Sequence, residues 1–163
     1  MSEANKQVAL NFLAAMDVGD GAAMDRCLTR DAFTNTQGFA GVSGQRSREM
    51  MVATASAFKD IVPTGFRPKM KNVVAEGDAV VLEFEGDAVL SNGERYCNQY
   101  VFVFSFENGK IKQLNEYFCT VLADKVMLPL LAQKGEEFAM GDANRSAPTE
   151  PSPGTASSRQ LEG

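Results

Sequence analysis

The first part of the chain carries hydrophobic residues at the spacing of amphipathic helices. Apolar side chains recur on one helical stripe over residues 3–18, and the sequence Gly19-Asp20-Gly21 that follows is a helix-ending signal. A shorter helical pattern covers residues 22–28. Ser47 can cap a third helix, which Pro63 ends. We therefore expect three helices before Pro63.

The hydrophobic pattern changes to that of strands after Pro63. Turn sequences rich in Gly, Asn and Asp separate four strand-like segments, which cover residues 66–75, 79–90, 95–106 and 110–122. A weaker alternation at residues 31–36 predicts a short strand before the third helix, and the Gly-rich connection after it is predicted to form turns. Helices followed by a meander of strands predict an α+β fold, with three N-terminal helices packed on a curved, mostly antiparallel sheet.

The chain of 163 residues is long enough for one domain with a hydrophobic core. A short helical pattern at residues 124–133 is interrupted by Pro129. Beyond Gly135 the composition shifts to Gly, Ala, Ser, Thr and Pro with isolated charges. Such a segment buries too little apolar surface to offset the entropy of ordering its backbone. We predict one domain over residues 1–134 and a disordered tail over residues 135–163.

The net charge limits the partners that the protein can bind. At −5, with a pI near 4.8 and scattered Lys and Arg, the chain lacks the clustered basic residues that bind nucleic acids or anionic membranes. No segment approaches the roughly 20 continuous apolar residues of a membrane span, and the polar amino terminus does not resemble a secretory signal. We therefore expect a cytoplasmic protein that binds neither nucleic acid nor membrane.

The sequence contains no histidine and three widely separated cysteines. Histidine is the commonest general base and the commonest metal ligand, so its absence excludes Ser-His-Asp triads, Cys-His nucleophile pairs and His-based zinc sites. Cys27, Cys97 and Cys119 have no paired metal-ligand spacing and are expected to be buried free thiols. We expect no metal and no cofactor.

Glu116 is the strongest candidate for a chemical role. Successive strand residues alternate between the two faces of a sheet, so Glu116 shares a face with Leu114 and Phe118. A carboxylate among apolar side chains loses hydration, which raises its pKa and prepares it to act as a general acid or base near neutral pH. The alternative is that Glu116 lies at a rim or pairs with an arginine such as Arg95.

The neighbouring strand places further candidates near Glu116. Asn98 and Tyr100 can form hydrogen bonds with a ligand; alternatively, Asn98 caps a strand end and Tyr100 belongs to the core. Both faces of this strand are largely apolar. That pattern fits helices on one face and either a homodimer partner or the carboxy-terminal segment on the other.

Four stretches of the sequence resemble the nuclear transport factor 2-like superfamily, and most closely its SnoaL-like group, which is related to polyketide cyclases and ketosteroid isomerases. These stretches are NFLAAMDVGD, DAFTNTQG, YCNQYVFVFSFENGKI and NEYFCT. By element order the resemblance covers residues 5–126. It implies a cone-shaped fold whose cavity binds a hydrophobic small molecule. Together with the strand alternation, it gives the residues expected to line the cavity around Glu116, which are Phe12, Met16, Asn35, Asn98, Tyr100, Phe102, Leu114 and Phe118.

The resemblance implies different roles in different branches of the superfamily. The sequence departs from ketosteroid isomerases at the three positions of their catalytic groups, here Phe12, Thr36 and Phe102. Their mechanism is therefore not expected. Compared with limonene epoxide hydrolases, Glu116 matches the water-activating aspartate and Asn35 the water-holding asparagine. Phe33 replaces the partner tyrosine, and no counterpart of the arginine–aspartate pair is found near Phe84, so a proton donor for an epoxide is missing.

Three functions fit these patterns. The first is a small cofactor-independent enzyme, an isomerase, cyclase, dehydratase or hydrolase, in which Glu116 moves a proton or activates water. The second is a non-catalytic domain that binds a hydrophobic ligand in the same cavity. The third is a dimeric interaction module that acts through its exposed sheet face and its tail, with a vestigial pocket. An enclosed cavity beside Glu116 favours the first two functions over the third.

Overall fold

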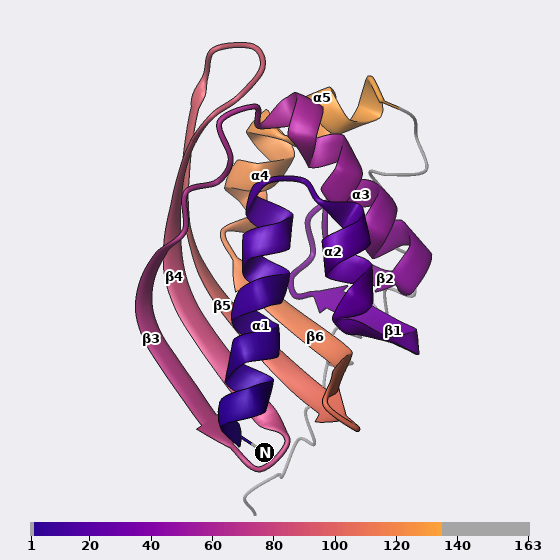
Figure 1. Ribbon diagram of the computed structural model, residues 1–163. Helices are drawn as coiled ribbons and strands as arrows, with labels where there is room; N and C mark the ends of the chain where they lie inside the picture. Colours follow the sequence, from indigo (N-terminus) through magenta and orange to yellow (C-terminus); the bar gives the residue numbers. More distant parts are fainter. Residues whose placement is uncertain (1, 135–163) are drawn as a thin grey trace, which may run out of the picture.

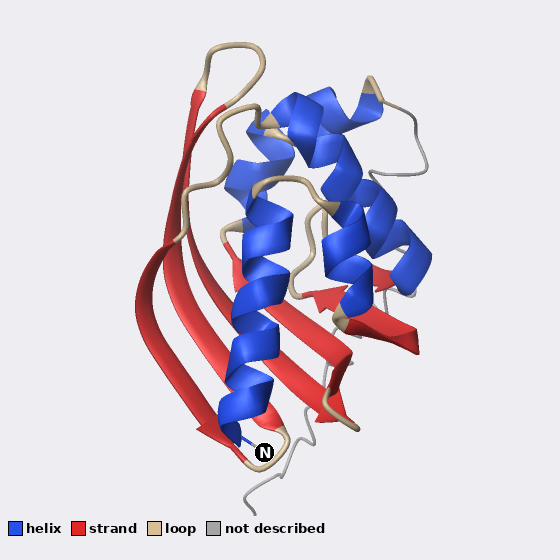
Figure 2. Cartoon of the chain, in the orientation of Figure 1, coloured by secondary structure: helices blue, strands red, loops and turns tan. Residues whose placement is uncertain are grey.

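Six strands form one curved sheet, and helices cover its concave face (Figures 1 and 2). The computed structural model describes residues 2–134, so the predicted tail lies outside the described residues. The strands lie in the order β2-β1-β6-β5-β4-β3. In chain order the elements are α1 (Ser2–Asp17), α2 (Gly21–Arg26), β1 (Leu28–Thr36), β2 (Gly44–Ser47), α3 (Arg48–Ile61), β3 (Lys69–Glu76), β4 (Ala79–Val89), β5 (Arg95–Glu107), β6 (Lys110–Phe118), α4 (Thr120–Val126) and α5 (Leu128–Ala132).

The predicted α+β fold is confirmed, with three helices before an antiparallel meander of β3 to β6. Strand β2 was not predicted, because it lies in the Gly-rich connection; it pairs antiparallel with β1. Strand β6 ends at Phe118 rather than at residue 122, because α4 begins at Thr120. The last helical pattern is two helices, and Pro129 lies in the first turn of α5, where its missing N–H is tolerated. No helix within residues 2–134 is long and apolar enough to cross a membrane.

A two-residue turn joins β5 and β6 and fixes how they pair. Asn108 and Gly109 have φ values of 51° and 74°. Positive φ at both central positions is the geometry of a type I′ turn, whose twist matches that of the flanking strands. A bulge beside Phe106 then sets the register in which Phe102 lies opposite Glu116. The sequence at the hairpin thus places Glu116 on the face that carries the aromatic residues of β5.

Strand β1 lies parallel to β6 and brings two threonines beside the candidate acid. Thr34 is aligned with Leu114 and Thr36 with Glu116. On its other side β1 pairs with β2, where Thr34 is opposite Arg46. Residues from three distant parts of the chain therefore meet at one end of β6.

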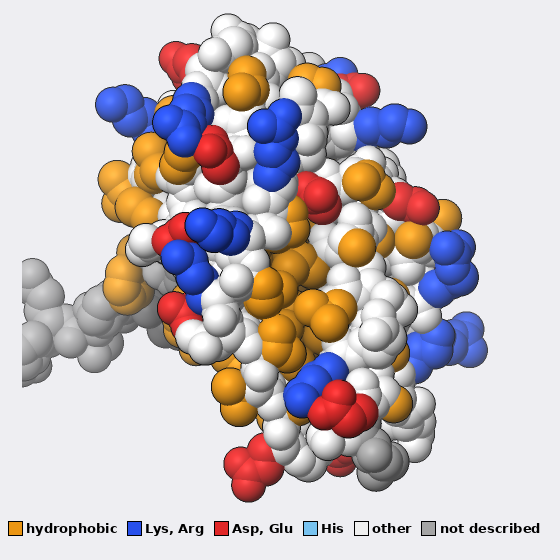
Figure 3. All heavy atoms as spheres, turned by 60° about the vertical axis from the view of Figure 1, so that its left-hand side comes forward, with side chains coloured by type: hydrophobic (Ala, Val, Ile, Leu, Met, Phe, Trp, Pro, Cys, Tyr) orange, Lys and Arg blue, Asp and Glu red, His pale blue; other side chains and the backbone are white. Residues whose placement is uncertain are grey.

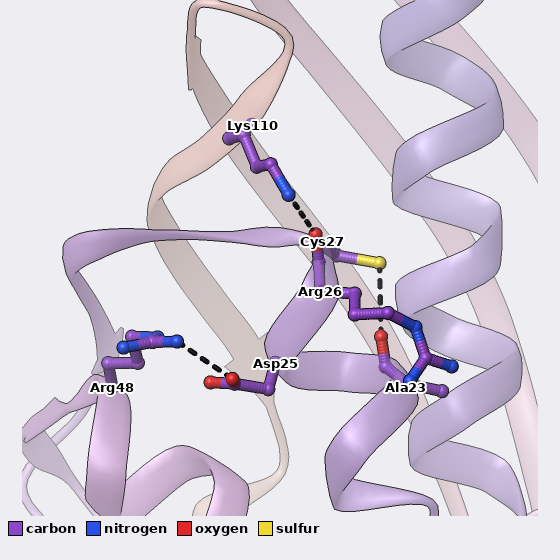
Figure 4. Close-up of polar contacts among 6 residues, drawn as sticks. All are labelled: Ala23, Asp25, Arg26, Cys27, Arg48 and Lys110. Atoms are coloured by element: carbon purple, nitrogen blue, oxygen red, sulfur yellow. Dashed lines mark hydrogen bonds and ion pairs between the residues drawn. The ribbon is translucent and has the colours of Figure 1, made fainter.

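Polar contacts at the end of α2 hold the start of β1 in place (Figure 4). Lys110 at the start of β6 donates to the backbone oxygen of Arg26. Arg48 of α3 forms an ion pair of 2.7 Å with Asp25. The buried Cys27 thiol donates to a carbonyl one helical turn earlier, and burial raises its pKa, so this group stays neutral. These contacts connect α2, α3 and β6 at the point where β1 enters the sheet.

The prediction of three buried thiols is wrong for Cys97 and Cys119, which are exposed. The alternation along β5 that buries Tyr96 and Asn98 turns Cys97 to the outer face. Cys119 follows the end of β6 and stands at the N-cap of α4. The apolar character of cysteine favours burial in general, but here the strand face decides the exposure of the thiol.

Aromatic side chains of β4 and β5 form the centre of the core, and α1 packs on them. Phe84, Phe102 and Phe104 are fully buried. Phe12 of α1 meets Phe104 edge-on, with 5.6 Å between the ring centroids. Burial of each such ring contributes about 1.5–3 kcal/mol. This packing fixes α1 over the sheet and closes one side of the space below it.

Strand β3 forms one edge of the sheet. Hydrophobic side chains gather in a band on the side of the molecule that carries α1 and β3 (Figure 3). Met70 and Val73 of β3 are half-buried and pack against the core. The neighbouring Lys71 is exposed and pairs with Glu85 at 3.1 Å. Charged residues on an edge strand disfavour pairing with another sheet.

Candidate functional site

A cavity of about 120 Å³ lies between the helices and the concave face of the sheet. Its walls are mostly apolar. Its phenylalanines are Phe12, Phe58, Phe66, Phe84, Phe102 and Phe118, and its methionines are Met16, Met24, Met51 and Met127. An engineered apolar cavity of about 150 Å³ binds benzene. The space is therefore the size of one small ring.

Glu116 is the only carboxylate among the described residues that line this cavity. Its Oε2 atom accepts a hydrogen bond of 2.6 Å from Thr36 Oγ1. Burial raises the pKa of the Glu116 carboxyl, while the bond from Thr36, the charge of Arg46 and the nearby Thr34 hydroxyl lower it in part. Loss of hydration is the largest of these effects, so the net shift is above the usual value of 4.5.

Arg46 supports Glu116 through Thr36. The Arg46 side chain is 8% exposed, and its Nη1 donates to Thr36 Oγ1 at 3.1 Å while its Nη2 donates to the carbonyl of Val42 at 2.6 Å. The Thr36 hydroxyl has a single proton. Because Thr36 accepts from Arg46, that proton is directed to Glu116. The three side chains form a relay, defined here as Arg46 to Thr36 to Glu116, in which every hydrogen bond points toward the carboxylate.

The relay places a positive charge near Glu116 without a direct ion pair. Within the described part of the chain, no carboxylate lies within the 4.0 Å ion-pair distance of Arg46. Burial lowers the pKa of Arg46 and the charge of Glu116 raises it in part. An arginine nonetheless stays protonated in proteins. The carboxylate is thus stabilised through an intervening hydroxyl, and no Lys or Arg of residues 2–134 forms an ion pair with it.

Two tyrosines and an asparagine form a second polar group at the cavity. Tyr96 and Tyr100 line the cavity, and their hydroxyl oxygens are 3.2 Å apart. Asn98 Nδ2 donates to the Tyr96 hydroxyl at 2.8 Å and to the carbonyl of Cys119 at 3.1 Å. Asn98 Oδ1 accepts from the backbone N–H of Cys119 at 3.2 Å. Asn98 therefore ties the end of β6 to β5 and holds Tyr96, and it does not border the cavity itself.

One further polar atom faces the cavity from the helical side. Thr54 of α3 lines the cavity, and its buried Oγ1 has no hydrogen-bond partner among the described residues. A buried hydroxyl without a partner loses the hydrogen bonds that it forms in water.

Six predicted residues lie together at the cavity, namely Glu116, Phe12, Met16, Tyr100, Phe102 and Phe118. Three others do not line it. Leu114 is fully buried in the core, and Asn98 is engaged as described above. Asn35 lies on the opposite face of β1 from Thr34 and Thr36, and its Nδ2 donates to Asn115 at 3.3 Å. The alternative pairing of Glu116 with Arg95 is wrong, because Arg95 binds Asp87 at 2.7 Å.

Sequence reasoning missed Thr36 and Arg46 as partners of Glu116, and it also missed Tyr96 at the cavity. The Tyr96 position was available from the alternation along β5, since Tyr96 shares a face with Tyr100. Thr36 and Arg46 depend on the parallel pairing of β1 with β6 and on the short strand β2. The pairing of β1 with β6 joins distant parts of the chain and leaves no turn signal. The Gly-rich connection between β1 and β2 predicted turns but no strand after them.

Replacing Thr36 with valine is expected to raise the pKa of Glu116 further, because valine keeps the side-chain shape and removes the hydroxyl that binds Oε2. A pH titration of the ¹³C-labelled glutamate carboxyls by NMR measures the change. Thr29→Val is the control, since the Thr29 hydroxyl binds Asp31 at the surface. An unchanged or lower pKa of Glu116 in Thr36→Val contradicts the relay.

The chain was compared with protein families, curated proteins and solved structures. A family model described as the SnoaL-like domain matches residues 9–114. No curated protein matches the chain. Among solved structures, Bal32a from a soil-derived mobile gene cassette is 22% identical with a TM-score of 0.67, and the match covers 77% of this chain and 97% of that one.

Two further solved structures have the same fold. A limonene-epoxide-hydrolase-like epoxide hydrolase of M. tuberculosis is 22% identical with a TM-score of 0.63, covering 82% of this chain and 96% of that one. A nuclear transport factor 2-like protein of unknown function from Burkholderia pseudomallei is 18% identical with a TM-score of 0.65, covering 77% of this chain and 98% of that one. At these identities the likeness shows the fold alone. The family model spans most of the domain, and the chain therefore belongs to the family of SnoaL-like domains.

Proposed function

We propose that this protein is a small cofactor-independent enzyme that moves a proton on, or activates water toward, a hydrophobic small molecule in the cavity. Glu116 is the proposed general acid or base. The observation that carries the proposal is a single carboxylate with a raised pKa in a small apolar cavity. General acid–base catalysis is most effective when the pKa of the group lies near the working pH, and burial moves Glu116 in that direction.

The relay gives Glu116 properties suited to repeated proton transfer. When Glu116 is ionised, the Thr36 hydroxyl and the charge of Arg46 stabilise the carboxylate. When it is protonated, the apolar surroundings favour the neutral form. Near neutral pH, the ionised and protonated forms of Glu116 are therefore closer in free energy than those of a glutamate in water. The hydrogen bond to Oε2 also fixes the carboxyl group, so the proton is exchanged at Oε1.

The size of the cavity limits the substrate. A cavity of about 120 Å³ accommodates one small ring, because an apolar cavity of similar volume binds benzene. The proposed substrate is therefore a compact hydrophobic ring rather than an extended polyketide. Isomerisation, cyclisation, dehydration and hydrolysis all require the proton transfer assigned to Glu116. Relatives in this fold include an epoxide hydrolase, which makes small epoxides reasonable test compounds.

A non-catalytic binding domain is the second candidate function. The methionine part of the lining, with Met16, Met24, Met51 and Met127, supports it, because flexible thioether side chains adapt to ligands of different shape. In this candidate Glu116 would orient a ligand without exchanging a proton. Turnover in a variant that lacks the acid separates the two functions.

The enzyme hypothesis predicts that Glu116→Gln lowers kcat by about 10²- to 10⁴-fold, the usual contribution of a general acid or base. The measurement is turnover of a panel of monocyclic ketones, enones and epoxides, followed by NMR in deuterated water. Ring binding should persist in the variant, because glutamine keeps the side-chain shape. Glu94→Gln, at an exposed position, is the control and should retain full turnover. Equal turnover by Glu116→Gln and the wild type contradicts the proposed role of Glu116.

We also propose that the chain forms a homodimer through the outer face of the sheet. A diagonal row of valines and a tyrosine crosses three strands there, flanked by Glu83 and Asn115: Val81 is paired with Val103, and Val101 with Tyr117, which is 46% exposed. The valines on this row are half-buried in the single chain. An apolar row on an outer sheet face is typical of a surface that a partner covers.

Sedimentation equilibrium tests the dimer. The wild type is expected to sediment as a dimer and Val103→Lys as a monomer, because a charge at the centre of the row must lose its hydration in the interface. Val18→Lys is the control, since Val18 is exposed at the end of α1. A monomeric wild type, or a dimeric Val103→Lys variant, contradicts this interface.

A further inference from the structure

The hydroxyl groups of the two tyrosines at the cavity carry one proton for which residues 2–134 provide no acceptor. Tyr96 and Tyr100 are 3% and 8% exposed, and both line the cavity. Their hydroxyls share one hydrogen bond, so one of the two phenol protons lies between them. The second phenol proton needs another acceptor. We call these two residues the tyrosine pair.

Asn98 cannot be that acceptor. Its Nδ2 points to the Tyr96 hydroxyl and is a donor only. The orientation of the amide is fixed by the backbone, because Oδ1 accepts from the N–H groups of Gln99 and Cys119 and Nδ2 also donates to the Cys119 carbonyl. No other acceptor within the described residues is hydrogen-bonded to the tyrosine pair. One phenol proton is therefore left without an acceptor in the described part of the chain.

The ring of Tyr100 packs against other aromatic rings. Tyr100 stacks on Phe84 with 4.9 Å between centroids, and its ring lies 5.4 Å from that of Phe118. A buried donor without an acceptor is unfavourable by about 1–3 kcal/mol, so such groups are normally satisfied. Burial also raises the pKa of Tyr100 well above its usual range, so the phenol remains a donor. Both tyrosines line the cavity, which can hold such an acceptor.

We propose that the tyrosine pair donates a hydrogen bond to an oxygen atom of the bound small molecule, which makes the ligand a compact ring carrying a carbonyl or ether oxygen. Either hydroxyl can supply the proton, because the bond between the two can point in either direction. This inference rests on the proposed function and specifies the substrate class of the same cavity. Tyr96 and Tyr100 are thus oxygen-binding and positioning residues.

The position of the tyrosine pair relative to Glu116 fits such a ligand. Tyr100 is paired with Phe118 on β6, and Glu116 with Phe102 on β5, so Tyr100 and Glu116 are diagonal neighbours on one face. Diagonal positions on antiparallel strands are about 7–8 Å apart. Both side chains border the same cavity, so one bound ring can present its oxygen to the tyrosine pair and a reacting atom to Glu116.

Binding of two rings of nearly equal shape tests this inference. Cyclohexanone carries the oxygen, and methylenecyclohexane has a CH₂ group in its place. The double variant Tyr96→Phe/Tyr100→Phe is expected to bind cyclohexanone a few-fold to about tenfold more weakly than the wild type, the net effect of one hydrogen bond. Its affinity for methylenecyclohexane should be unchanged. Each single variant should retain most of the affinity for cyclohexanone, because one phenol with a free proton remains.

The infrared carbonyl stretch gives a readout that packing alone does not move. In the wild type, bound cyclohexanone should absorb at lower frequency than cyclohexanone in hexane, and the double variant should abolish this shift. Tyr117→Phe removes a phenol on the outer face and should have no effect. If the double variant does not fold, the wild type and the two single variants should each show the lowered frequency.

The outcomes separate this inference from the proposed function. Binding of both rings with no lowered carbonyl frequency in the wild type overturns the inference, and so does a lowered frequency that persists in the double variant. In those cases the proposed enzyme function is still tested independently, by whether Glu116→Gln lowers turnover. A protein that binds neither ring contradicts both the inference and the proposed use of the cavity.

Discussion

The loss of hydration at the Glu116 carboxyl is the interaction on which the rest of the site depends. A buried carboxylate is unfavourable unless hydrogen bonds or a nearby cation stabilise it. Thr36 supplies a hydrogen bond of 2.6 Å, and Arg46 supplies a charge through Thr36 rather than by direct contact. A direct ion pair would hold Glu116 ionised and lower its pKa. The intervening hydroxyl leaves the pKa raised, as the proposed proton transfer requires.

The apolar core around the acid has two roles. The rings of Phe84, Phe102 and Phe118 stabilise the fold and also remove water from one side of Glu116. The same rings separate two polar groups, the relay and the tyrosine pair. An apolar space with a few directed polar groups orients a ligand by its few polar atoms. In the proposed function, the small volume of the cavity limits the ligand to a compact ring, and the polar groups orient that ring.

The sequence predicted the parts of the site that depend on strand alternation. Tyr100, Phe102, Glu116 and Phe118 lie on the predicted face because β5 and β6 are long and joined by a tight turn that fixes their register. The prediction failed at Asn35. A shift of one residue in a strand moves a side chain to the other face, and β1 had too weak a pattern to settle its orientation.

Arg46 shows a second limit of the sequence. It follows a Gly-rich connection, and its role arises only when β2 pairs with β1 and β1 with β6. The pairing of β1 with β6 has no local signal, because Thr36 and Glu116 are 80 residues apart in the chain. Strand β2 follows β1 closely but has only four residues, too few for a recognisable strand pattern. Asn98 was predicted on the correct face, but its amide is used by the backbone of Cys119 and by Tyr96. Alternation gives the direction of a side chain and does not give its partner.

The difference in unfolding free energy between the wild type and Glu116→Gln, measured from pH 3 to pH 8, is the most direct test of the central claim. The pKa of Glu116 is raised in the folded state, so its contribution to stability is fully present below about pH 4.5, its usual value, and is lost as the pH rises through the folded pKa. The wild type should therefore lose stability relative to the variant over that range and then reach a plateau. A difference that is independent of pH contradicts the claim that burial raises the pKa of the Glu116 carboxyl. A wild type that gains stability relative to the variant as the pH rises contradicts it as well.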